Sequence, residues 1–295
     1  RQTYPATVVF EGHEPASIER SSAFAKITHA NCTATSVLRL PVGEPIEIKP
    51  STTVSLPTRA GGHLLVVDRN EAEGVAVLAA AVVGIAAQLG RATARVNIVN
   101  MTTSDAEWTD VPHHLANAFG SQVQVLDRRG LEACVDALGG LVKQYLSSGK
   151  RPAERHFLAI FGLHRVREFR QESPRSRFAA SPEGERPDVS AAFVRILREG
   201  AEAGIHVLAW CDTLSSLDKL GEPRIITEFG TRLVGPMSSS DSHKLLDDDA
   251  ASKIERPHRM IKFDEDRVGV LETFRPFAMP SLDWLTKIGR STEAN

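Results

Sequence analysis

Apolar and polar residues follow one another along this chain in blocks that predict alternating strands and helices from residue 61 onward. Residues 63–67 form a short apolar run, as in a buried strand, and residues 71–89 form a long Ala/Val/Leu-rich segment of helical length. The alternation continues with strands at 95–100, 122–126, 156–160 and 205–210 and with helices at 112–119, 131–146 and 189–203. This order favours an α/β fold with one doubly wound, mostly parallel sheet.

The two ends of the chain show a different pattern. Residues 1–60 are β-rich and loop-rich, with apolar runs at 7–10 and 37–40 and a roughly alternating stretch at 44–49 that Pro50 ends. We interpret them as an N-terminal β-rich extension of a main domain that spans residues 61–295. Residues 260–263 and 268–273 predict a C-terminal β-hairpin, and a short strand is expected at 232–234. Residues 165–188 are charged and proline-containing, which is typical of a mobile excursion.

Composition narrows the class of protein. The chain has 295 residues, of which 42% are hydrophobic and 24% charged, as in an ordinary globular protein. A net charge of −2 provides no overall attraction to nucleic acid or to an anionic membrane. No apolar run spans a bilayer without polar interruption, so a buried helix is expected at residues 75–89. The sequence starts at Arg1 without an initiating Met, which suggests a piece of a longer polypeptide.

The three cysteines, Cys32, Cys134 and Cys211, lie far apart in the sequence. Their number is odd and their spacing matches neither a disulfide framework nor a zinc motif. We therefore expect a reducing compartment and no metal site.

The turn between the first strand and the long helix occupies the place of the phosphate-binding motif G-x-x-x-x-G-K-[ST]. Asp68 and Glu73 stand at its two glycines, Gly74 at its lysine and Val75 at its hydroxyl residue. In an active loop, glycine backbone N–H groups wrap the phosphates and the lysine neutralises their charge. The strand–turn–helix architecture is expected to be kept while its phosphate chemistry is lost.

Charge at this turn supports the same interpretation. The turn also contains Arg69, Asn70 and Glu71, so three carboxylates (Asp68, Glu71 and Glu73) lie at the start of the helix and would repel phosphate. Asn70 as N-cap and Glu73 as its third-residue partner would form a capping box. The protein's own acids would then satisfy the positive end of the helix, and we favour this self-capped helix over a nucleotide site.

Two further strand ends bear on nucleotide chemistry. After residues 157–160, where an active enzyme would place acids for magnesium, the chain has Phe161 and Gly162, which cannot hold a metal ion. His164 could serve as a base, although a lone histidine beside a strand end is more often a packing or surface residue. Asp212 follows the strand at 205–210 and is either a functional polar residue at the ligand-binding edge or a cap for a helix beginning near residue 215.

Several segments together resemble the FtsK/SpoIIIE branch of the HerA–FtsK translocases, over residues 42–280. Residues 62–67 are similar to the family's "pHLLVAG" strand, and residues 197–209 to its "RxGRAxGIHLILATQRP" segment. Residues 231–233 and 238–247 resemble "TRI…VSSxxDSRxILD", and residues 274–277 resemble the closing "RPF". The resemblance implies a RecA-like P-loop NTPase fold.

Departures from the family pattern imply a degenerate site. Gly74 replaces the lysine, Phe161-Gly162 replace the Asp-Glu pair, Asp212 replaces the γ-phosphate-sensing glutamine and Ala201 replaces an arginine. The Thr231-Arg232 match survives. In the family this arginine lies near a subunit interface, so Arg232 is a candidate inter-subunit arginine, although a surface salt bridge is the favoured alternative.

Three functions fit these features. The favoured one is a catalytically degenerate domain of a larger translocase, with no catalytic residue and no cofactor, which acts in assembly, partner docking or regulation. The second is an active DNA translocase motor that binds ATP and Mg²⁺ and has a basic pore-facing loop at residues 165–177. The third is a terminal domain of a type VII secretion ATPase that binds an exported protein's signal.

The family also suggests partners and a location. Other ATPase domains of the same polypeptide or ring are the expected partners, with a protein substrate or DNA as further candidates. Membrane insertion of this segment is not expected. The domain would be cytoplasmic, alone or as the cytosolic part of a membrane-anchored protein.

Overall fold

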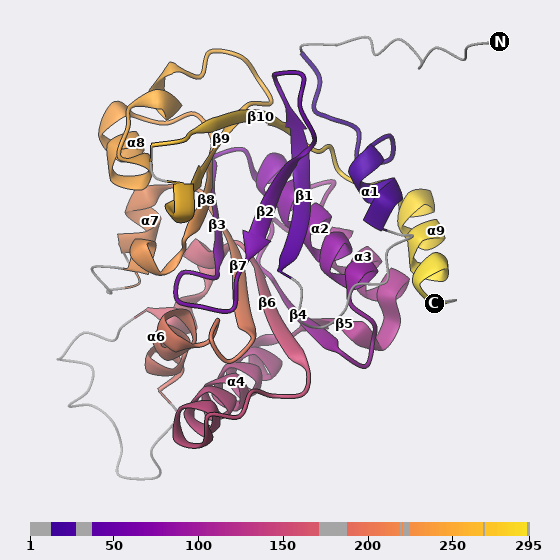
Figure 1. Cartoon of the computed structure of the whole chain (residues 1–295), viewed down its shortest axis with the longest axis vertical. Coiled ribbons are helices and arrows are strands. Elements are labelled where there is room, and N and C mark those ends of the chain that lie inside the picture. The colour runs from indigo at the N-terminus through magenta and orange to yellow at the C-terminus, as the bar shows by residue number, and fades with distance from the viewer. Residues whose placement is uncertain are drawn as a thin grey trace.

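The computed structural model describes residues 13–27, 37–170, 188–218, 220, 225–267 and 269–293. Ten strands form one sheet in the order β2-β1-β10-β9-β8-β3-β7-β6-β4-β5 (Figure 1). Six neighbouring strands are parallel: β8 (Thr231–Val234), β3 (Leu64–Val67), β7 (Ile205–Cys211), β6 (Arg155–Phe161), β4 (Ala94–Asn100) and β5 (Val123–Leu126). The predicted α/β class with a mostly parallel sheet is confirmed.

The central strands are buried on both faces, which explains their nearly continuous apolar sequences. Every residue of β3 and of β7 is buried. The first helix after β3, α2 (Glu71–Gln88), is also buried from Gly74 to Ala86. By length and composition α2 is apolar enough to cross a membrane, but 78% of it is buried inside the protein, so it is a core helix as expected.

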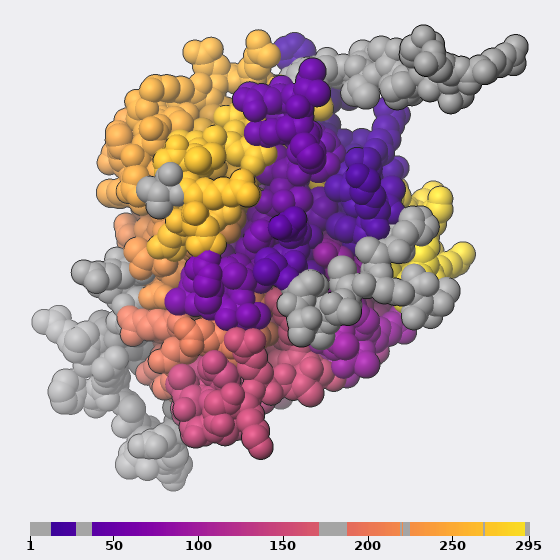
Figure 2. Space-filling view, in the orientation of Figure 1, coloured from indigo at the N-terminus to yellow at the C-terminus, as the bar shows by residue number. Residues whose placement is uncertain are grey.

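The remaining strands extend the sheet in antiparallel fashion: β9 (Met260–Asp264), β10 (Glu272–Pro276), β1 (Leu38–Pro45) and β2 (Thr52–Leu56). The predicted C-terminal hairpin is confirmed as β9 and β10. Strand β1 pairs with β10 and not with a separate N-terminal sheet, so strands from the N-terminal and C-terminal parts of the chain belong to the same sheet. Figure 2 shows the purple N-terminal strands beside the yellow C-terminal segment on one face.

One strand prediction is wrong. The expected strand at 44–49 is instead the end of β1, followed by a bend at residues 46–50 and then β2. Pro50 lacks a backbone N–H and so could not extend a ladder, and the turn forms before it. The expected strand at 7–10 and the excursion beyond residue 170 lie outside the described residues.

Helices cover both faces of the sheet, and two apolar clusters result. One face holds α1 (Ser22–Ile27), α2, α3 (Val111–Phe119) and α9 (Leu282–Glu293); the other holds α4 (Arg128–Ser148), α6 (Val189–Glu199), α7 (Leu214–Asp218) and α8 (Ser239–Leu246). The indigo α1 lies beside the yellow α9 in Figure 1, where Phe24 meets Trp284 edge-to-face at 5.7 Å. The doubly wound arrangement leaves the C-terminal ends of the parallel strands as the edge where a site can form.

Candidate functional site

The predicted nucleotide-site positions converge at the C-terminal ends of β3, β6 and β7. Asp68 follows β3 directly, and α2 begins three residues later. Val67 lies opposite Cys211, and Phe161 lies opposite Trp210, so the ends of the three strands are level with one another. The structure therefore brings the turn, the end of β6 and Asp212 together at one edge of the sheet.

Trp210 is the centre of this edge. Its side chain is 1% exposed and its indole N–H donates a hydrogen bond to the backbone oxygen of Asp68 at 2.9 Å. A Cβ placed on Gly74 would lie 2.2 Å from Cδ1 of the indole, so no side chain fits at position 74. The lysine position of the phosphate-binding motif thus has to be glycine because the indole lies against the first turn of α2.

Gly74 and Trp210 differ in side-chain size from the residues that the family pattern has at their positions. Counting along the "GIHLILATQ" segment from Gly204 places Trp210 at the alanine, whereas Gly74 stands at the lysine. Relative to that pattern, the residue on the helix is smaller and the residue on the strand that faces it is larger. Close packing requires that such exchanges compensate one another.

Glu71 is held by Arg165. The guanidinium donates to both carboxylate oxygens, at 2.9 and 3.1 Å, and also to the Met101 backbone oxygen at 2.7 Å. Thr103 donates its N–H and its hydroxyl to the same carboxylate, each at 2.7 Å. Although burial opposes ionisation, the hydrogen bonds from Arg165 and Thr103 lower the pKa of Glu71 to about 2. The carboxylate is therefore charged, and both of its oxygens accept hydrogen bonds from residues of the same chain.

The contacts of Arg165 bear on the predicted basic, pore-facing loop at residues 165–177. Its guanidinium lies 5.6 Å from the centre of the Trp210 ring and is tied to Glu71. It does not belong to a solvated basic loop that would face a pore. Of the other arginines in that predicted loop, Arg167 and Arg170 are exposed, and Arg170 donates to the His164 backbone oxygen. Positions 175 and 177 lie outside the described residues.

The predicted capping box does not form. The backbone N–H of Asn70 donates to Asp68 Oδ1 at 2.8 Å, and the Asn70 side chain makes no cap hydrogen bond. Its amide instead donates to Glu73 Oε1 at 2.8 Å, the same oxygen that lies 2.9 Å from Nδ1 of His258. The prediction fails because Asp68 takes the N–H that Glu73 would have accepted, and His258 draws Glu73 away. Burial raises the pKa of Glu73, while the charge of His258 opposes that rise.

Asp68 is a buried acid. It is 4% exposed, and within the described part of the chain its Oδ2 atom has no hydrogen-bond partner. Burial raises the pKa of Asp68 from 3.8 to about 7; the Asn70 N–H opposes this shift and the charge of Glu73 adds to it. Gly235 of the neighbouring strand end leaves room for this carboxyl, since a Cβ there would lie 2.3 Å from Oδ2. The Asp68 carboxyl therefore occupies the inner side of the turn, packed against Gly235.

The other positions add no ligand for nucleotide or magnesium. Arg69 is exposed, and Val75 and Phe161 are fully buried apolar side chains. Gly162 has a φ of +105°, and a Cβ there would meet the Met101 oxygen at 2.9 Å, so this position needs glycine for its backbone and not for a ligand.

Asp212 lies just before α7 with its side chain 37% exposed. Its Oδ1 atom accepts a hydrogen bond from the Thr213 N–H at 2.7 Å and lies 3.7 Å from Nδ1 of His164. Burial raises the pKa of the neighbouring Cys211 to about 12, so this side chain is a thiol as long as no metal ion binds it. Asp212 thus supports the start of α7 and is also open to the edge of the sheet.

Arg232 is a buried residue with hydrogen bonds inside its own domain. It is 7% exposed, and its guanidinium donates to the backbone oxygens of Phe229 (3.1 Å) and Leu245 (2.9 Å). It also lies 4.8 Å from the centre of the Phe263 ring. The predicted surface salt bridge is wrong, because the side chain is buried and donates to two backbone oxygens. The inter-subunit role stays a prediction.

Replacing Arg232 by alanine is expected to destabilise the isolated domain by about 2 kcal/mol, because two carbonyls lose their buried donor. Chemical denaturation measures this loss. Arg290→Ala on the exposed face of α9 is the control and should change stability little. Equal, near-zero effects for both variants would show that Arg232 has no internal role.

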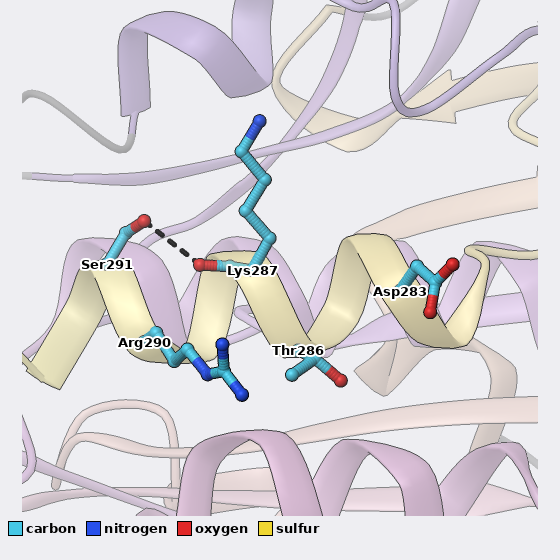
Figure 3. Close-up of a pocket in the computed structure, with 5 residues that line it drawn as sticks. All are labelled: Asp283, Thr286, Lys287, Arg290 and Ser291. Atoms are coloured by element: carbon cyan, nitrogen blue, oxygen red, sulfur yellow. Dashed lines mark hydrogen bonds between the residues drawn. The ribbon is translucent and has the colours of Figure 1, made fainter.

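A surface hollow of about 540 Å³ lies elsewhere, on α9. Within the described residues its lining comes from this helix alone: Asp283, Thr286, Lys287, Arg290 and Ser291. Figure 3 shows Lys287 and Arg290 pointing to opposite sides of the helix, so their charges do not converge on one ligand. The hollow is not a second candidate site.

Three residues of the site are missing from the sequence prediction: Trp210, Arg165 as an inward-facing partner, and His258. Trp210 has a usable signal, since it is the largest side chain at a position where the family segment has alanine. His258 has none. It pairs with Glu73 across 185 residues of sequence from a loop with no distinguishing pattern.

Comparison with known proteins supports the fold. No protein-family profile and no curated protein sequence matches the chain. The conjugation coupling protein TcpA of pCW3, in a monomer form with ATPγS, is similar with a TM-score of 0.62 and 13% identity, over 87% of this chain and 71% of that one. ATPases 2 and 3 of EssC from Geobacillus thermodenitrificans are similar with a TM-score of 0.58 and 12% identity, over 90% and 50%.

A third similar structure is EccC from Thermomonospora curvata, ATPases 2 and 3, in complex with a signal sequence peptide. Its TM-score is 0.57 at 14% identity, and the match covers 88% of this chain and 43% of that one. The chain thus spans half or less of the EssC and EccC chains. At such identities the likeness shows the fold, which is that of FtsK/SpoIIIE-type P-loop ATPase domains. The predicted fold and the resemblance are confirmed at that level.

Proposed function

We propose that this chain is a catalytically degenerate FtsK/SpoIIIE-like ATPase domain of a larger translocase, which acts in assembly, partner docking or regulation. The observation that carries the proposal is the contact between Trp210 and Gly74. The indole takes the space above the first turn of α2 and excludes any side chain at the lysine position. A P-loop ATPase uses that lysine to neutralise the phosphates.

The chemistry of the rest of the site supports the same conclusion. Phosphate binding at a helix N-terminus needs free backbone N–H groups and positive charge. Here the Asn70 N–H is bonded to Asp68, and the nearby cation Arg165 is neutralised by Glu71. Magnesium needs side-chain oxygens at the end of β6, where Phe161 and Gly162 have none. The residues present therefore do not fit Mg·ATP.

The role in docking or regulation rests on the kind of protein that shares the fold. EccC and EssC structures contain more than one ATPase domain, and one EccC structure holds a signal sequence peptide. We infer that other ATPase domains of the same polypeptide are the first partners of this chain, in the cytoplasm. A protein substrate is favoured over DNA because the net charge of −2 gives no general attraction to phosphate.

The expected result of titrating the full chain with Mg·ATP in a calorimeter is no binding tighter than about 1 mM, which corresponds to roughly −4 kcal/mol. The physical reason is the acidic, filled turn. A motif-complete ATPase domain run under the same conditions is the positive control. Binding in the micromolar range would overturn the proposal, since it would require the turn to open and another cation to replace the lysine.

A further inference from the structure

Three side chains with metal-binding atoms converge beside Trp210. His164 comes from the 3-10 turn Leu163–Arg165 after β6, Cys211 is the last residue of β7, and Asp212 follows it. One ligand atom from each lies within 4.8 Å of the other two. The Asp212 Oδ1 atom is 3.7 Å from His164 Nδ1 and 3.7 Å from Cys211 Sγ.

We propose that His164, Cys211 and Asp212 bind a divalent transition metal ion of the zinc class. Imidazole nitrogen, thiolate sulfur and carboxylate oxygen are the three ligand types that zinc takes in proteins. Zinc–ligand bonds of about 2.0 to 2.3 Å at tetrahedral angles place neighbouring ligand atoms about 3.4 to 3.6 Å apart. The two 3.7 Å separations are within a few tenths of an ångström of those edges, and the third pair, His164 and Cys211, lies within 4.8 Å and would have to approach further on binding.

The surroundings hold the ligands in place. The His164 ring meets the Trp210 ring edge-to-face at 5.2 Å, and the Arg170 guanidinium donates to the His164 backbone oxygen at 2.9 Å. Cys211 is fixed at the end of a fully buried strand. Packing of this kind sets ring and strand positions before a ligand arrives, which reduces the entropy lost on binding.

The three ligands differ in their exposure to solvent. Asp212 is the most exposed of the three, with 37% of its side chain accessible, whereas Cys211 is buried. Three protein ligands with one open side suit a metal that also takes water or a group from a partner. No local motif indicates this site, because its ligands come from two strand ends, 47 positions apart, and contain only one cysteine.

The competing interpretation is a local hydrogen-bond cluster. The Cys211 thiol lies 3.3 Å from the Thr213 backbone oxygen, and Asp212 Oδ1 accepts from the Thr213 N–H at 2.7 Å. The Asp212 N–H also points at His164 Nδ1, at 3.4 Å, which is long for a hydrogen bond. The Cys211 thiol also donates to Asp212 Oδ1 at 3.7 Å, and the same oxygen faces His164 Nδ1 at 3.7 Å, so direct contacts join the three groups as well. A metal titration separates such a cluster from a metal site, because only the metal site binds the ion through all three side chains.

Cobalt substitution tests the proposal because Co²⁺ reports its ligands optically. Titration of the reduced full chain with Co²⁺ is expected to saturate at one equivalent. It should produce a thiolate-to-cobalt charge-transfer band in the near ultraviolet and the intense visible bands of a tetrahedral ion. Zn²⁺ should then remove both sets of bands by displacement.

Variants assign the ligands. Cys211→Ser is expected to abolish the charge-transfer band, while His164→Gln and Asp212→Asn should each weaken Co²⁺ binding at least tenfold. The control is Cys32→Ser/Cys134→Ser, which removes the other two cysteines and should keep the full spectrum. Circular dichroism of each metal-free variant checks that it is folded. If Cys211→Ser does not fold, the affinity of His164→Gln for Co²⁺ decides the test.

Four outcomes would overturn the proposal. The first is a wild-type titration without a charge-transfer band. The second is a band that persists in a folded Cys211→Ser, and the third is a band lost in the control that keeps Cys211. The fourth is an unchanged Co²⁺ affinity in a folded His164→Gln. None of these measurements uses nucleotide, so they test the metal site independently of the proposed loss of ATP binding.

Discussion

The double variant Gly74→Lys/Trp210→Ala is expected to lose less stability than the sum of its two single variants. Lysine alone at position 74 forces a Cβ to 2.2 Å from the indole, and overpacking of this kind costs about 1–3 kcal/mol or more. Alanine alone at position 210 empties the space of a buried indole, which costs roughly 3–5 kcal/mol. In the double variant the lysine stem can occupy that space, so we expect a coupling of about 1–3 kcal/mol.

Chemical denaturation of wild type, both single variants and the double variant measures the coupling. Gly140→Lys is the matched control for introducing lysine into a helix, because Gly140 lies on the exposed side of α4 with no atom within 4 Å of its Cβ position. This control should be neutral or stabilising, since glycine is a poor helix former. Strict additivity at positions 74 and 210 would show that the two residues do not exchange volume, and would remove the main support for a filled site.

Asp68→Asn is expected to become steadily more stable than wild type as the pH rises from about 4 to 7. The wild-type carboxyl has a pKa raised by burial from 3.8 to about 7. In that range the folded protein keeps the proton while the unfolded chain loses it, so wild-type stability falls by about 1.4 kcal/mol per pH unit from this group. Asparagine does not titrate, and the difference between the two proteins should approach roughly 4 kcal/mol and level off above pH 7.

Comparing the two proteins at each pH isolates Asp68 from other titrating groups. His63 and His206 are fully buried, and burial lowers their pKa values to about 4 and about 3. These two histidines make the protein less stable as the pH falls below about 6.5, which is opposite in sign to the effect of Asp68. The reason is that their side chains bind protons in the unfolded chain but not in the folded protein. Their contribution cancels in the difference, provided that both proteins keep the same fold.

Denaturation midpoints at pH 4.5, 6, 7 and 8 supply the measurement. Asp136→Asn, on the exposed face of α4, controls for the loss of a surface acid. A stability difference between Asp68→Asn and wild type that stays flat across this range would contradict a buried, protonated Asp68.

The proposed loss of the nucleotide site would be distributed over several contacts, and this bears on how it could be reversed. Restoring the lysine alone meets the indole of Trp210. Removing the indole alone leaves Glu71 paired with Arg165 and Glu73 paired with His258. A working phosphate site would need all of these groups to change together, which is consistent with a domain whose function no longer depends on ATP.

The sequence by itself determined the order of the elements and the class of fold. The apolar runs that became β3, β6 and β7 and the long apolar helix α2 are local patterns, and burial on both faces of a parallel sheet is the environment that such runs require. It also showed that the motif positions 68–75 lack the phosphate-binding residues, since that is a matter of residue identity alone.

Only the tertiary structure decided what fills the site. The order of strands in the sheet places Trp210 against Gly74, Arg165 against Glu71 and His258 against Glu73, over separations of up to 185 residues. It also buries Arg232 and pairs the N-terminal β1 with β10. Periodicity and capping patterns describe neighbours along the chain, whereas these contacts depend on which strands lie side by side, and no local pattern carries that information.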